Sequence, residues 1–460
     1  MQSRKRLFGT NGVRGIFGRD LDFNLITKLS YSLATFFKSG SLLIGQDARL
    51  SSPIISRLVS SVINSAGVDV WDAGIIPTPC LQFATKRYRY GGGIMITASH
   101  NPPKYNGIKP IAFDGVELSR EDELKVEDIY FKKIFSRTDG CGILFNNDNI
   151  INPYIDTVLS LVDKEMIRNR EFKVIMDLGN GVQGVVAPLL LERLGCKVIT
   201  INGEMDGTFP GRGSEPTLNN INQLCEVVRD LDANFGVAYD GDGDRSIFCD
   251  EKGIAHTGDK TGALLVKYLL KSRHSGAEII CPINSTMLIS SIASEENSKV
   301  LFTKVGSVEV SRQMVARNSI IGLEENGGFM YGKINEVRDG AMTTALTLEM
   351  LASSTTHESL SQMLNSLPKT YQYKSKFECG TIDNANRAVE RCLNYKNPIK
   401  SETIDGAKLW IDNDSWLLVR PSGTEPLLRI YAESVDKSQL YSMVEEYTSV
   451  IENALRQTNP

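Results

Sequence analysis

Three aspartates stand at alternate positions in the segment Asp240-Gly241-Asp242-Gly243-Asp244-Arg245. Apolar residues flank the segment on both sides, which predicts a loop between two strands. Glycines between the carboxylates permit unusual backbone angles, so the three side chains can converge on one hard cation. A calcium EF-hand is an alternative, because Glu251 stands at the twelfth position, but Arg245 stands where that loop requires glycine. Magnesium beside a phosphate group fits best, and a solvated acidic turn is the remaining alternative.

A serine that could carry a phosphoryl group lies in Thr97-Ala98-Ser99-His100-Asn101-Pro102-Pro103. The segment follows a predicted strand over residues 93–97, and the prolines prevent a helix from continuing. A hydrolase nucleophile elbow needs glycine two residues to either side of the serine, where this chain has Thr97 and Asn101. Ser99 is therefore a candidate phosphoryl carrier, and a purely structural turn is the alternative.

A glycine-rich segment over residues 179–184 matches the dinucleotide-binding pattern G-x-G-x-x-G between a predicted strand and a predicted helix. Glu204 and Asp206 end the next predicted strand, where the residue that binds a ribose would be expected. A nicotinamide-dependent dehydrogenase is therefore an alternative function. A tight turn between strand and helix would explain the same glycines without any cofactor.

Two later segments could bind the other parts of a phosphorylated sugar. Residues 420–426, Arg-Pro-Ser-Gly-Thr-Glu-Pro, combine a guanidinium group, two hydroxyls and backbone N–H groups, which together suit a phosphate. Arg429 on the following predicted strand could join them. Glu324 and Asn326 lie between glycines in residues 322–328, where they could bind sugar hydroxyls or belong to a solvated loop.

The composition is that of a globular protein with several domains. A chain of 460 residues is too long for one hydrophobic core, and its apolar and charged fractions, 41% and 23%, are ordinary. The net charge of −4 argues against a nucleic-acid or membrane-surface partner, and no apolar run is long enough to span a bilayer. The eight cysteines form no C-x-x-C pair and the four histidines lack metal-ligand spacing, which predicts reduced thiols in a cytoplasmic protein without zinc.

The elements that must position these segments alternate between helix and strand over most of the chain. Apolar residues recur at helical spacing over 25–37, and further helices are predicted over 56–66 and 185–194. Three α/β units, each with its own sheet, are therefore expected to precede a smaller α+β unit. The first predicted domain, residues 1–151, carries the serine loop, and the second, residues 152–251, carries the acidic loop. The third, residues 252–367, carries the sugar loop, and the fourth, residues 368–460, carries the phosphate clamp.

Taken in this order, the motifs closely resemble those of the α-D-phosphohexomutase superfamily over essentially the whole chain. Its members share Thr-Ala-Ser-His-Asn-Pro, Asp-Gly-Asp-Gly-Asp-Arg, Gly-x-Glu-x-Ser/Asn-Gly and Arg-x-Ser-Gly-Thr-Glu-Pro, which here are residues 97–102, 240–245, 322–327 and 420–426. The opening residues 8–15 resemble the family's Phe-Gly-Thr-Asp-Gly-Val/Ile-Arg-Gly, with Asn11 in place of Asp. Such an opening is typical of phosphoglucosamine mutases and archaeal phosphomannomutase/phosphoglucomutases. The resemblance implies four domains around a central cleft.

The resemblance also implies a role for each residue. Ser99 would carry the phosphoryl group, Arg245 would hold the phosphoserine, and a hexose 1,6-bisphosphate would be both intermediate and activator. The implied ligands of Mg²⁺ are Ser99, Asp240, Asp242 and Asp244. The implied substrate-binding residues are Lys304, Glu324, Asn326, Arg420, Ser422, Gly423, Thr424 and Arg429.

The acid–base group is less well defined by the resemblance. Many bacterial relatives have a histidine after the sugar loop and Lys-Thr-Gly-His in the third domain, where this chain has Gly328 and Ser307 instead. Lys109, expected to be buried near Arg14, is the first candidate for the general base, and His100 is the second.

We therefore expect a phosphomannomutase/phosphoglucomutase that acts on small sugar phosphates, as a monomer or homodimer without nucleic-acid or membrane partners. Phosphoglucosamine mutase is the alternative activity. A dehydrogenase and a catalytically silent sugar-phosphate-binding protein are the alternatives from other classes.

Overall fold

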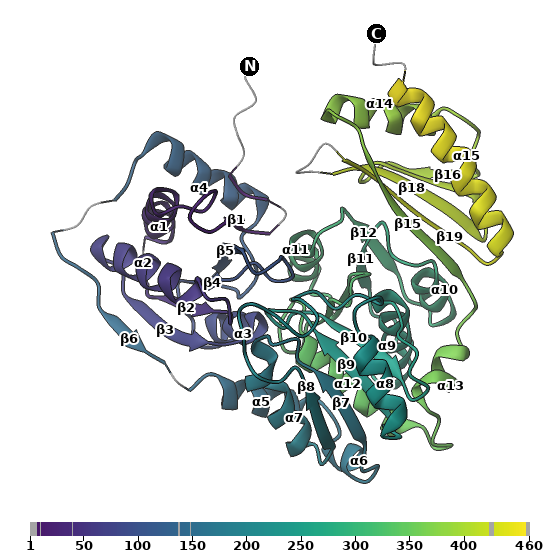
Figure 1. Ribbon diagram of the computed structural model, residues 1–460, viewed down its shortest axis with the longest axis horizontal. Helices are drawn as coiled ribbons and strands as arrows, with labels where there is room; N and C mark the ends of the chain where they lie inside the picture. Colours follow the sequence, from purple (N-terminus) through teal and green to yellow (C-terminus); the bar gives the residue numbers. More distant parts are fainter. Residues whose placement is uncertain are drawn as a thin grey trace.

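The computed structural model describes residues 7–9, 11–38, 40–136, 139–147, 149–422 and 427–456. Its strands form four sheets that follow one another along the chain, and helices pack beside each sheet (Figure 1). The first three sheets lie side by side, and the fourth stands at the end of the molecule that holds the carboxyl terminus. No helix in the described part of the chain is both long and apolar enough to cross a bilayer.

The first sheet has six strands in the order β1-β5-β4-β2-β3-β6. Strands β4, β2, β3 and β6 run parallel, whereas β5 runs antiparallel to both β4 and β1. The strands are β1 (Val13–Ile16), β2 (Leu42–Gln46), β3 (Val70–Ile75), β4 (Gly92–Ile96), β5 (Tyr105–Ala112) and β6 (Leu144–Asn146). The helices are α1 (Phe23–Phe37), α2 (Ser52–Ser65), α3 (Thr78–Arg87) and α4 (Arg120–Lys132).

The second sheet has four strands in the order β10-β9-β7-β8, of which only β10 is antiparallel to its neighbour. All five residues of β9 are buried, so this apolar strand needs cover on both faces. The strands are β7 (Lys173–Asp177), β8 (Lys197–Ile201), β9 (Phe235–Tyr239) and β10 (Ser246–Asp250). The helices are α5 (Ile151–Ser160), α6 (Lys164–Arg168), the 3₁₀ helix η1 (Val182–Val185), α7 (Ala187–Arg193) and α8 (Asn222–Asp230).

The third sheet has the order β12-β11-β13-β14, with β14 antiparallel to β13. Helix α12 (Gly340–Ser353) is buried from Gly340 to Ala352, as expected for a helix that is apolar on all sides. The strands are β11 (Ile279–Pro282), β12 (Val300–Thr303), β13 (Ile321–Leu323) and β14 (Phe329–Tyr331). The other helices are α9 (Gly258–Ser272), α10 (Leu288–Glu295), α11 (Ser307–Arg317) and α13 (Leu360–Asn365).

The fourth sheet is antiparallel throughout, in the order β15-β19-β18-β17-β16. It has its own hydrophobic core, and a small cluster that includes Met287 and Trp416 joins it to the third unit. The strands are β15 (Tyr371–Glu378), β16 (Lys400–Glu402), β17 (Ala407–Asp412), β18 (Ser415–Pro421) and β19 (Leu427–Ser434). The helices are α14 (Ile382–Leu393) and α15 (Lys437–Arg456).

One hydrophobic core is shared by the first three units. It extends without interruption from Leu43 on β2 to Leu367 after α13. The predicted fold class, three α/β units followed by an α+β unit, is confirmed. The four predicted domain ranges remain a proposal, and each sheet falls within one of them.

Local sequence explains where several helices begin. Helix α1 begins at Phe23 because the side chain of Asp22 accepts a hydrogen bond from Leu25 N at 2.7 Å. Helix α2 begins at Ser52, earlier than predicted, because proline is compatible with a first helical turn. The helix predicted over 185–194 is divided into η1 and α7, since Val186 has the non-helical angles φ −124° and ψ −59°.

Candidate active site

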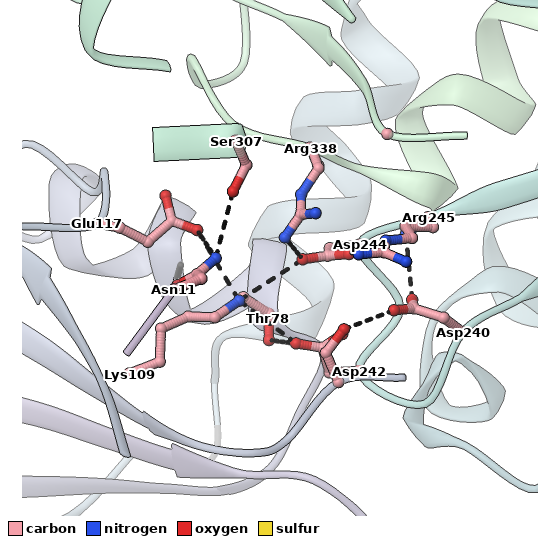
Figure 2. A network of polar contacts seen from close by, with 12 residues as sticks. Asn11, Thr78, Lys109, Glu117, Asp240, Asp242, Asp244, Arg245, Ser307 and Arg338 are labelled. Carbon is pink, nitrogen blue, oxygen red and sulfur yellow. Dashed lines mark hydrogen bonds and ion pairs between the residues drawn. The ribbon is translucent and has the colours of Figure 1, made fainter. Parts of the chain in front are cut away.

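The loop between β9 and β10 brings three carboxylates together (Figure 2). One oxygen atom from each of Asp240, Asp242 and Asp244 lies within 4.8 Å of the others, and all three residues are buried. Within the described part of the chain, Asp242 Oδ1 and Asp244 Oδ1 have no hydrogen-bond partner. Buried carboxylate oxygens without donors are costly, and a hard divalent cation would satisfy them. The cluster therefore fits a divalent cation.

Ser99 lies beside this cluster, on the loop that follows β4. Its Oγ donates a 2.8 Å hydrogen bond to Asp240 Oδ2, and its side chain is fully buried. Ser99 has φ 49°, in the left-handed region that costs a non-glycine residue about 1–3 kcal/mol. Gly241 faces the serine backbone, because a Cβ atom there would lie 2.8 Å from Ser99 O. The two loops are thus packed together at the backbone level.

Lys109, on β5, is the cation at the centre of the site. Its Nζ lies 3.5 Å from Asp242 Oδ2, 3.5 Å from Asp244 Oδ2 and 3.8 Å from Glu117 Oε1. Figure 2 shows the lysine between Glu117 and the acidic loop. The residue is buried, as predicted from the sequence, and its direct ionic partners are carboxylates. Lys109 therefore balances part of the acidic charge.

The neighbouring carboxylates differ in their protonation behaviour. Burial raises the pKa of Asp240 well above its usual value, and the charges of Asp244 and Asp242 raise it further. Burial alone would also raise the pKa of Asp242, but Lys109 and the hydroxyl of Thr78 hold it below the usual range. Asp242 is therefore ionised over the whole working pH range, and repulsion within the cluster is concentrated on Asp240.

His100 and Arg14 also contact the loop that carries Ser99. His100 Nδ1 is 3.3 Å from Ser99 Oγ, and the pKa of the imidazole is lowered by Arg245, then by burial and by Arg14. The ring is therefore uncharged near neutral pH. Arg14 donates to Asn101 Oδ1 at 2.8 Å, and burial lowers the pKa of its guanidinium to about 10, which leaves it a cation.

Arg338 joins the acidic loop to the predicted sugar loop. Its guanidinium donates to Asp244 Oδ2 and, at 3.2 Å, to Glu324 Oε2, and all three side chains are buried. Burial alone would lower the pKa of Arg338, but Asp244 and Glu324 raise it above its usual value. The sequence analysis missed Arg338, which belongs to no motif used there. The available signal was an arginine directly before Asp339, the N-cap residue of α12.

The predicted sugar loop packs against the first residue of β10. Ser246 N donates to Gly327 O at 3.0 Å, and a Cβ atom on Gly327 would lie 2.4 Å from Ser246 O. Burial raises the pKa of Glu324, and Arg338 opposes this rise. Asn326 Oδ1 accepts a hydrogen bond from Gly328 N at 3.2 Å. Glu324 thus belongs to the same polar network as the acidic loop.

Four domain families match successive parts of the chain. They are described as phosphoglucomutase/phosphomannomutase alpha/beta/alpha domains I, II and III, over residues 5–137, 152–253 and 257–371, and the C-terminal domain of the same family, over residues 388–449. A phosphoglucosamine/phosphogalactosamine mutase from Sulfurisphaera tokodaii is 40% identical over 97% of this chain and 99% of its own length. A phosphoglucomutase/phosphomannomutase from Thermococcus kodakarensis is 39% identical over 98% of this chain and 99% of its own. The chain belongs to the α-D-phosphohexomutase superfamily.

Solved phosphohexomutase structures share the fold. A phosphoglucomutase/phosphomannomutase family protein from Burkholderia thailandensis superimposes with a TM-score of 0.88, at 24% identity over 97% of both chains. An Aspergillus fumigatus N-acetylphosphoglucosamine mutase, solved with GlcNAc-6P and magnesium, gives a TM-score of 0.62 at 14% identity over 97% of this chain and 96% of its own. These structures confirm the predicted fold, and the sequence relatives confirm the predicted family and the prediction of a phosphohexomutase.

In this phosphohexomutase the glycine-rich segment at 179–184 supports the acidic loop. Gln183 Nε2 donates to Gly243 O at 2.9 Å, and Val182 N donates to Gly241 O at 3.3 Å. A Cβ atom on Gly181 would lie 3.0 Å from Gly241 O. Close packing beneath the acidic loop therefore accounts for the glycines, in agreement with the alternative of a tight turn.

Of the remaining predicted residues, Arg245 lies beside the carboxylates, whereas Lys304 and Arg420 lie on other elements. Arg245 donates its backbone N–H to Asp240 Oδ1 at 3.1 Å and its Nη1 to Glu215 at 3.4 Å. Lys304 is exposed on the loop between β12 and α11. In the fourth unit, Arg420 Nε donates to Asp405 at 2.9 Å.

Two other predicted clamp residues, Ser422 and Arg429, lie where the described parts of β18 and β19 pair. Arg429 is exposed on β19 opposite Arg420, and Ser422 is buried at the end of β18. Gly423 and Thr424 lie outside the described residues.

Asn11, whose counterpart in the family is usually aspartate, connects the first and third units. Its Nδ2 donates at 3.2 Å to both Glu117 Oε1 and Ser307 Oγ (Figure 2). Ser307 occupies the position at which many bacterial relatives have histidine. Neither residue was assigned a role from the sequence.

Proposed function

We propose that this phosphohexomutase interconverts hexose 1-phosphates and hexose 6-phosphates through a phosphoserine at Ser99. The observation that carries the proposal is the 2.8 Å hydrogen bond from Ser99 Oγ to Asp240, within a buried cluster suited to a cation. Phosphomannomutase/phosphoglucomutase activity is our first candidate and phosphoglucosamine mutase the second. The similar identities to relatives with each name, 39% and 40%, support both.

Ser99, Asp240, Asp242 and Asp244 would hold Mg²⁺. The bound ion would offset the negative charge that the phosphoryl oxygens bring to the carboxylates. Two unpartnered oxygens, Asp242 Oδ1 and Asp244 Oδ1, support this ligand set. The family resemblance and the magnesium in the Aspergillus fumigatus relative favour Mg²⁺ over other divalent ions.

Phosphorylated Ser99 would give its phosphoryl group to the free hydroxyl of a bound hexose monophosphate. The bond from phosphorus to Ser99 Oγ breaks as the bond to the sugar oxygen forms, and the proton of the sugar hydroxyl passes to a base. The product is a hexose 1,6-bisphosphate. After the sugar turns around, its other phosphoryl group passes to Ser99 and the new monophosphate leaves. Added bisphosphate would therefore act as an activator by phosphorylating free Ser99.

Lys109 and His100 are the candidates for the base. Lys109 Nζ lies 3.5 Å from two of the proposed metal ligands, close to where the phosphoryl group must sit. His100 Nδ1 lies 3.3 Å from Ser99 Oγ, but the lowered pKa of its ring makes it a weak proton acceptor and places it second. We keep Lys109 as the first candidate; its ammonium group would have to release a proton before the amine could act as the base. Loss of turnover in Lys109→Met with near-normal turnover in His100→Gln would support it, and the reverse result would favour His100.

The substrate would be held from two sides. Glu324 and Asn326 would bind sugar hydroxyls, and Arg14, Arg245 and Lys304 would meet phosphate oxygens. The second phosphate would bind to Arg420, Ser422, Gly423, Thr424 and Arg429. The burial of Glu324 beside Arg338 supports the first group, because it places a sugar-binding carboxylate in the same network as the metal loop.

The decisive experiment compares turnover of mannose, glucose and glucosamine 1-phosphates in the presence of Mg²⁺ and the matching bisphosphate. Mass spectrometry of the peptide that contains Ser99 should show phosphate in the active enzyme and none in Ser99→Ala. Phosphate on another residue, or turnover in Ser99→Ala, would exclude the proposed mechanism. We also propose a cytoplasmic monomer or homodimer, since seven of the eight cysteines are buried free thiols.

A further inference from the structure

We infer that Asp47 and Arg49 are positioning residues that set the geometry of the phosphoserine loop; the inference rests on the proposed role of Ser99. Both residues lie in the connection between β2 and α2, and both are buried, with 1% and 0% of their surfaces exposed. Arg49 Nε and Asp47 Oδ2 form an ion pair at 3.0 Å. Neither residue belongs to the acidic cluster, so they would act on the reaction through Ser99.

Each of the five N–H groups of the Arg49 guanidinium donates a hydrogen bond. Besides the Nε bond to Asp47, Nη2 donates to Ser99 O at 2.7 Å and Asn101 O at 2.6 Å. The other terminal nitrogen, Nη1, donates to Pro102 O at 2.8 Å and Tyr105 O at 3.0 Å. One side chain therefore gathers three carbonyl groups of the serine loop and a fourth, Tyr105 O, from the first residue of β5.

Asp47 is connected to the backbone N–H group of Ser99 through the hydroxyl of Thr97. Its Oδ2 accepts a 2.7 Å hydrogen bond from Thr97 Oγ1, which in turn accepts a 2.8 Å hydrogen bond from Ser99 N. Asp47 Oδ1 accepts from Ser52 Oγ at 2.6 Å, which fixes the carboxylate to α2. Both backbone groups of Ser99 are thus connected to the Asp47–Arg49 pair. These bonds explain how a serine is kept at φ 49°.

The second unit covers this network. The guanidinium carbon of Arg49 lies 5.0 Å from the centroid of the Phe209 ring. Gly207 permits this close approach, because a Cβ atom there would lie 2.5 Å from Ala48 O and Leu50 N. Ser214 Oγ also donates to Asn101 O at 2.8 Å. The loop is therefore enclosed between its own sheet and the segment before α8.

The consequence is a specific effect on turnover. Without Arg49, four carbonyl groups lose their shared donor, and Ser99 can relax away from the left-handed region. Its Oγ would then leave the position from which it reaches Asp240. A displacement of about 1 Å in a reacting group can reduce a rate about 100-fold. Substrate binding should change little, because the residues proposed to hold the sugar lie on other loops.

The test uses Arg49→Ala and Thr97→Val, with Arg170→Met as a matched control. Arg170 also donates to two carbonyl groups, Leu351 O and Ser354 O, and lies 5.4 Å from a phenylalanine ring, but it is in the second unit away from Ser99. We expect Arg49→Ala to lower kcat about 100-fold and Thr97→Val to lower it about tenfold, with KM within about twofold. Arg170→Met should keep the wild-type kcat.

Two further readouts separate positioning from stability. Added guanidinium ion should restore part of the kcat of Arg49→Ala, whereas sodium chloride at equal ionic strength should not. The rate at which glucose 1,6-bisphosphate phosphorylates Ser99, followed by mass spectrometry, should fall in parallel with kcat. If Arg49→Ala does not fold, Thr97→Val decides by the same kcat and phosphorylation measurements.

The inference is overturned if the folded variants keep the wild-type kcat, or if only KM changes. A wild-type enzyme without phosphate on Ser99 and without turnover would instead overturn the proposed function, so the two failures are distinguishable.

Discussion

Ser99 donates its hydroxyl hydrogen bond to Asp240, a residue 141 positions further along the chain, at 2.8 Å. The bond crosses from the first unit to the second and ends on the carboxylate whose pKa is raised by burial and by its neighbours Asp244 and Asp242. The proposed phosphoryl carrier therefore meets the part of the site where electrostatic repulsion is greatest. Several experiments follow from this arrangement.

Asp240→Asn should stabilise the metal-free protein while abolishing turnover. Without a cation, a third buried carboxylate adds repulsion and a desolvation cost, so a neutral side chain at this position should raise the free energy of unfolding. The measurement is denaturant unfolding near neutral pH in a chelator. A loss of stability in Asp240→Asn would show that repulsion does not dominate this position.

Chelation should remove activity, and Mg²⁺ should restore it. A binding readout independent of turnover is the melting temperature, which should rise with Mg²⁺ in the wild-type protein. The rise should be much smaller in Asp242→Asn, because the pKa of Asp242 is held low and its carboxylate is always available as a ligand. An equal rise in both proteins would place the cation elsewhere.

Arg338→Met should be strongly destabilising. It would leave Asp244 and Glu324 buried without their shared partner, and losing one partner of a buried ion pair costs about 3–5 kcal/mol. The double variant Arg338→Met/Glu324→Gln should recover part of this loss, as measured in a double-mutant cycle by urea unfolding.

Arg317→Met is the matched control for Arg338, since Arg317 pairs with Glu278 at the surface with 46% of its side chain exposed. Its removal should cost less than about 1 kcal/mol. Equal effects at the two sites would contradict the structural role given to Arg338.

Asp339 should make stability depend on pH. Burial raises its pKa from 3.8 to about 6, although Tyr154 and the N-cap bond to Met342 oppose the shift. The folded protein binds this proton more tightly than the unfolded chain, so the contribution is greatest below pH 3.8 and is lost as the pH rises through about 6. The total loss is about 3 kcal/mol.

Asp339→Asn keeps a capping side chain and should remove this pH dependence from urea unfolding curves. Asp163→Asn is the control, because Asp163 caps α6 through a 2.9 Å bond to Met166 but is exposed. Parallel pH profiles for Asp339→Asn and the wild-type protein would contradict the assignment.

The sequence was informative where chemistry is local. Alternating aspartates and glycines predicted the acidic loop, which the structure shows as a carboxylate cluster suited to a cation. Hydrophobic periodicity predicted α1, and the strand predicted over residues 93–97 is β4 to within one residue. Helix α2 begins at Ser52, earlier than the predicted start at residue 56, because Pro53 in its first turn was not used as a signal of a helix start.

Long-range partners could not be predicted. Arg338 is an ordinary arginine in sequence, and its two partners stand 94 and 14 residues away. The partners of Arg49 could not be predicted either, because four of its acceptors are backbone carbonyl groups, which every residue type has. Lys109 was expected to be buried near Arg14, but its ionic partners Asp242 and Asp244 follow it by more than 130 residues and could not be predicted.

The position of Arg338 in the chain also bears on how the site is assembled during translation. Asp240, Asp242 and Asp244 leave the ribosome well before the arginine, which follows Asp244 by 94 residues. Arg14, Lys109 and Arg245 are synthesised earlier, but Arg338, the arginine that pairs with both Asp244 and Glu324, arrives only with the start of α12. For that interval the nascent acidic loop lacks its final counter-charge. Maturation of the cation site is therefore a late event in the biosynthesis of the enzyme.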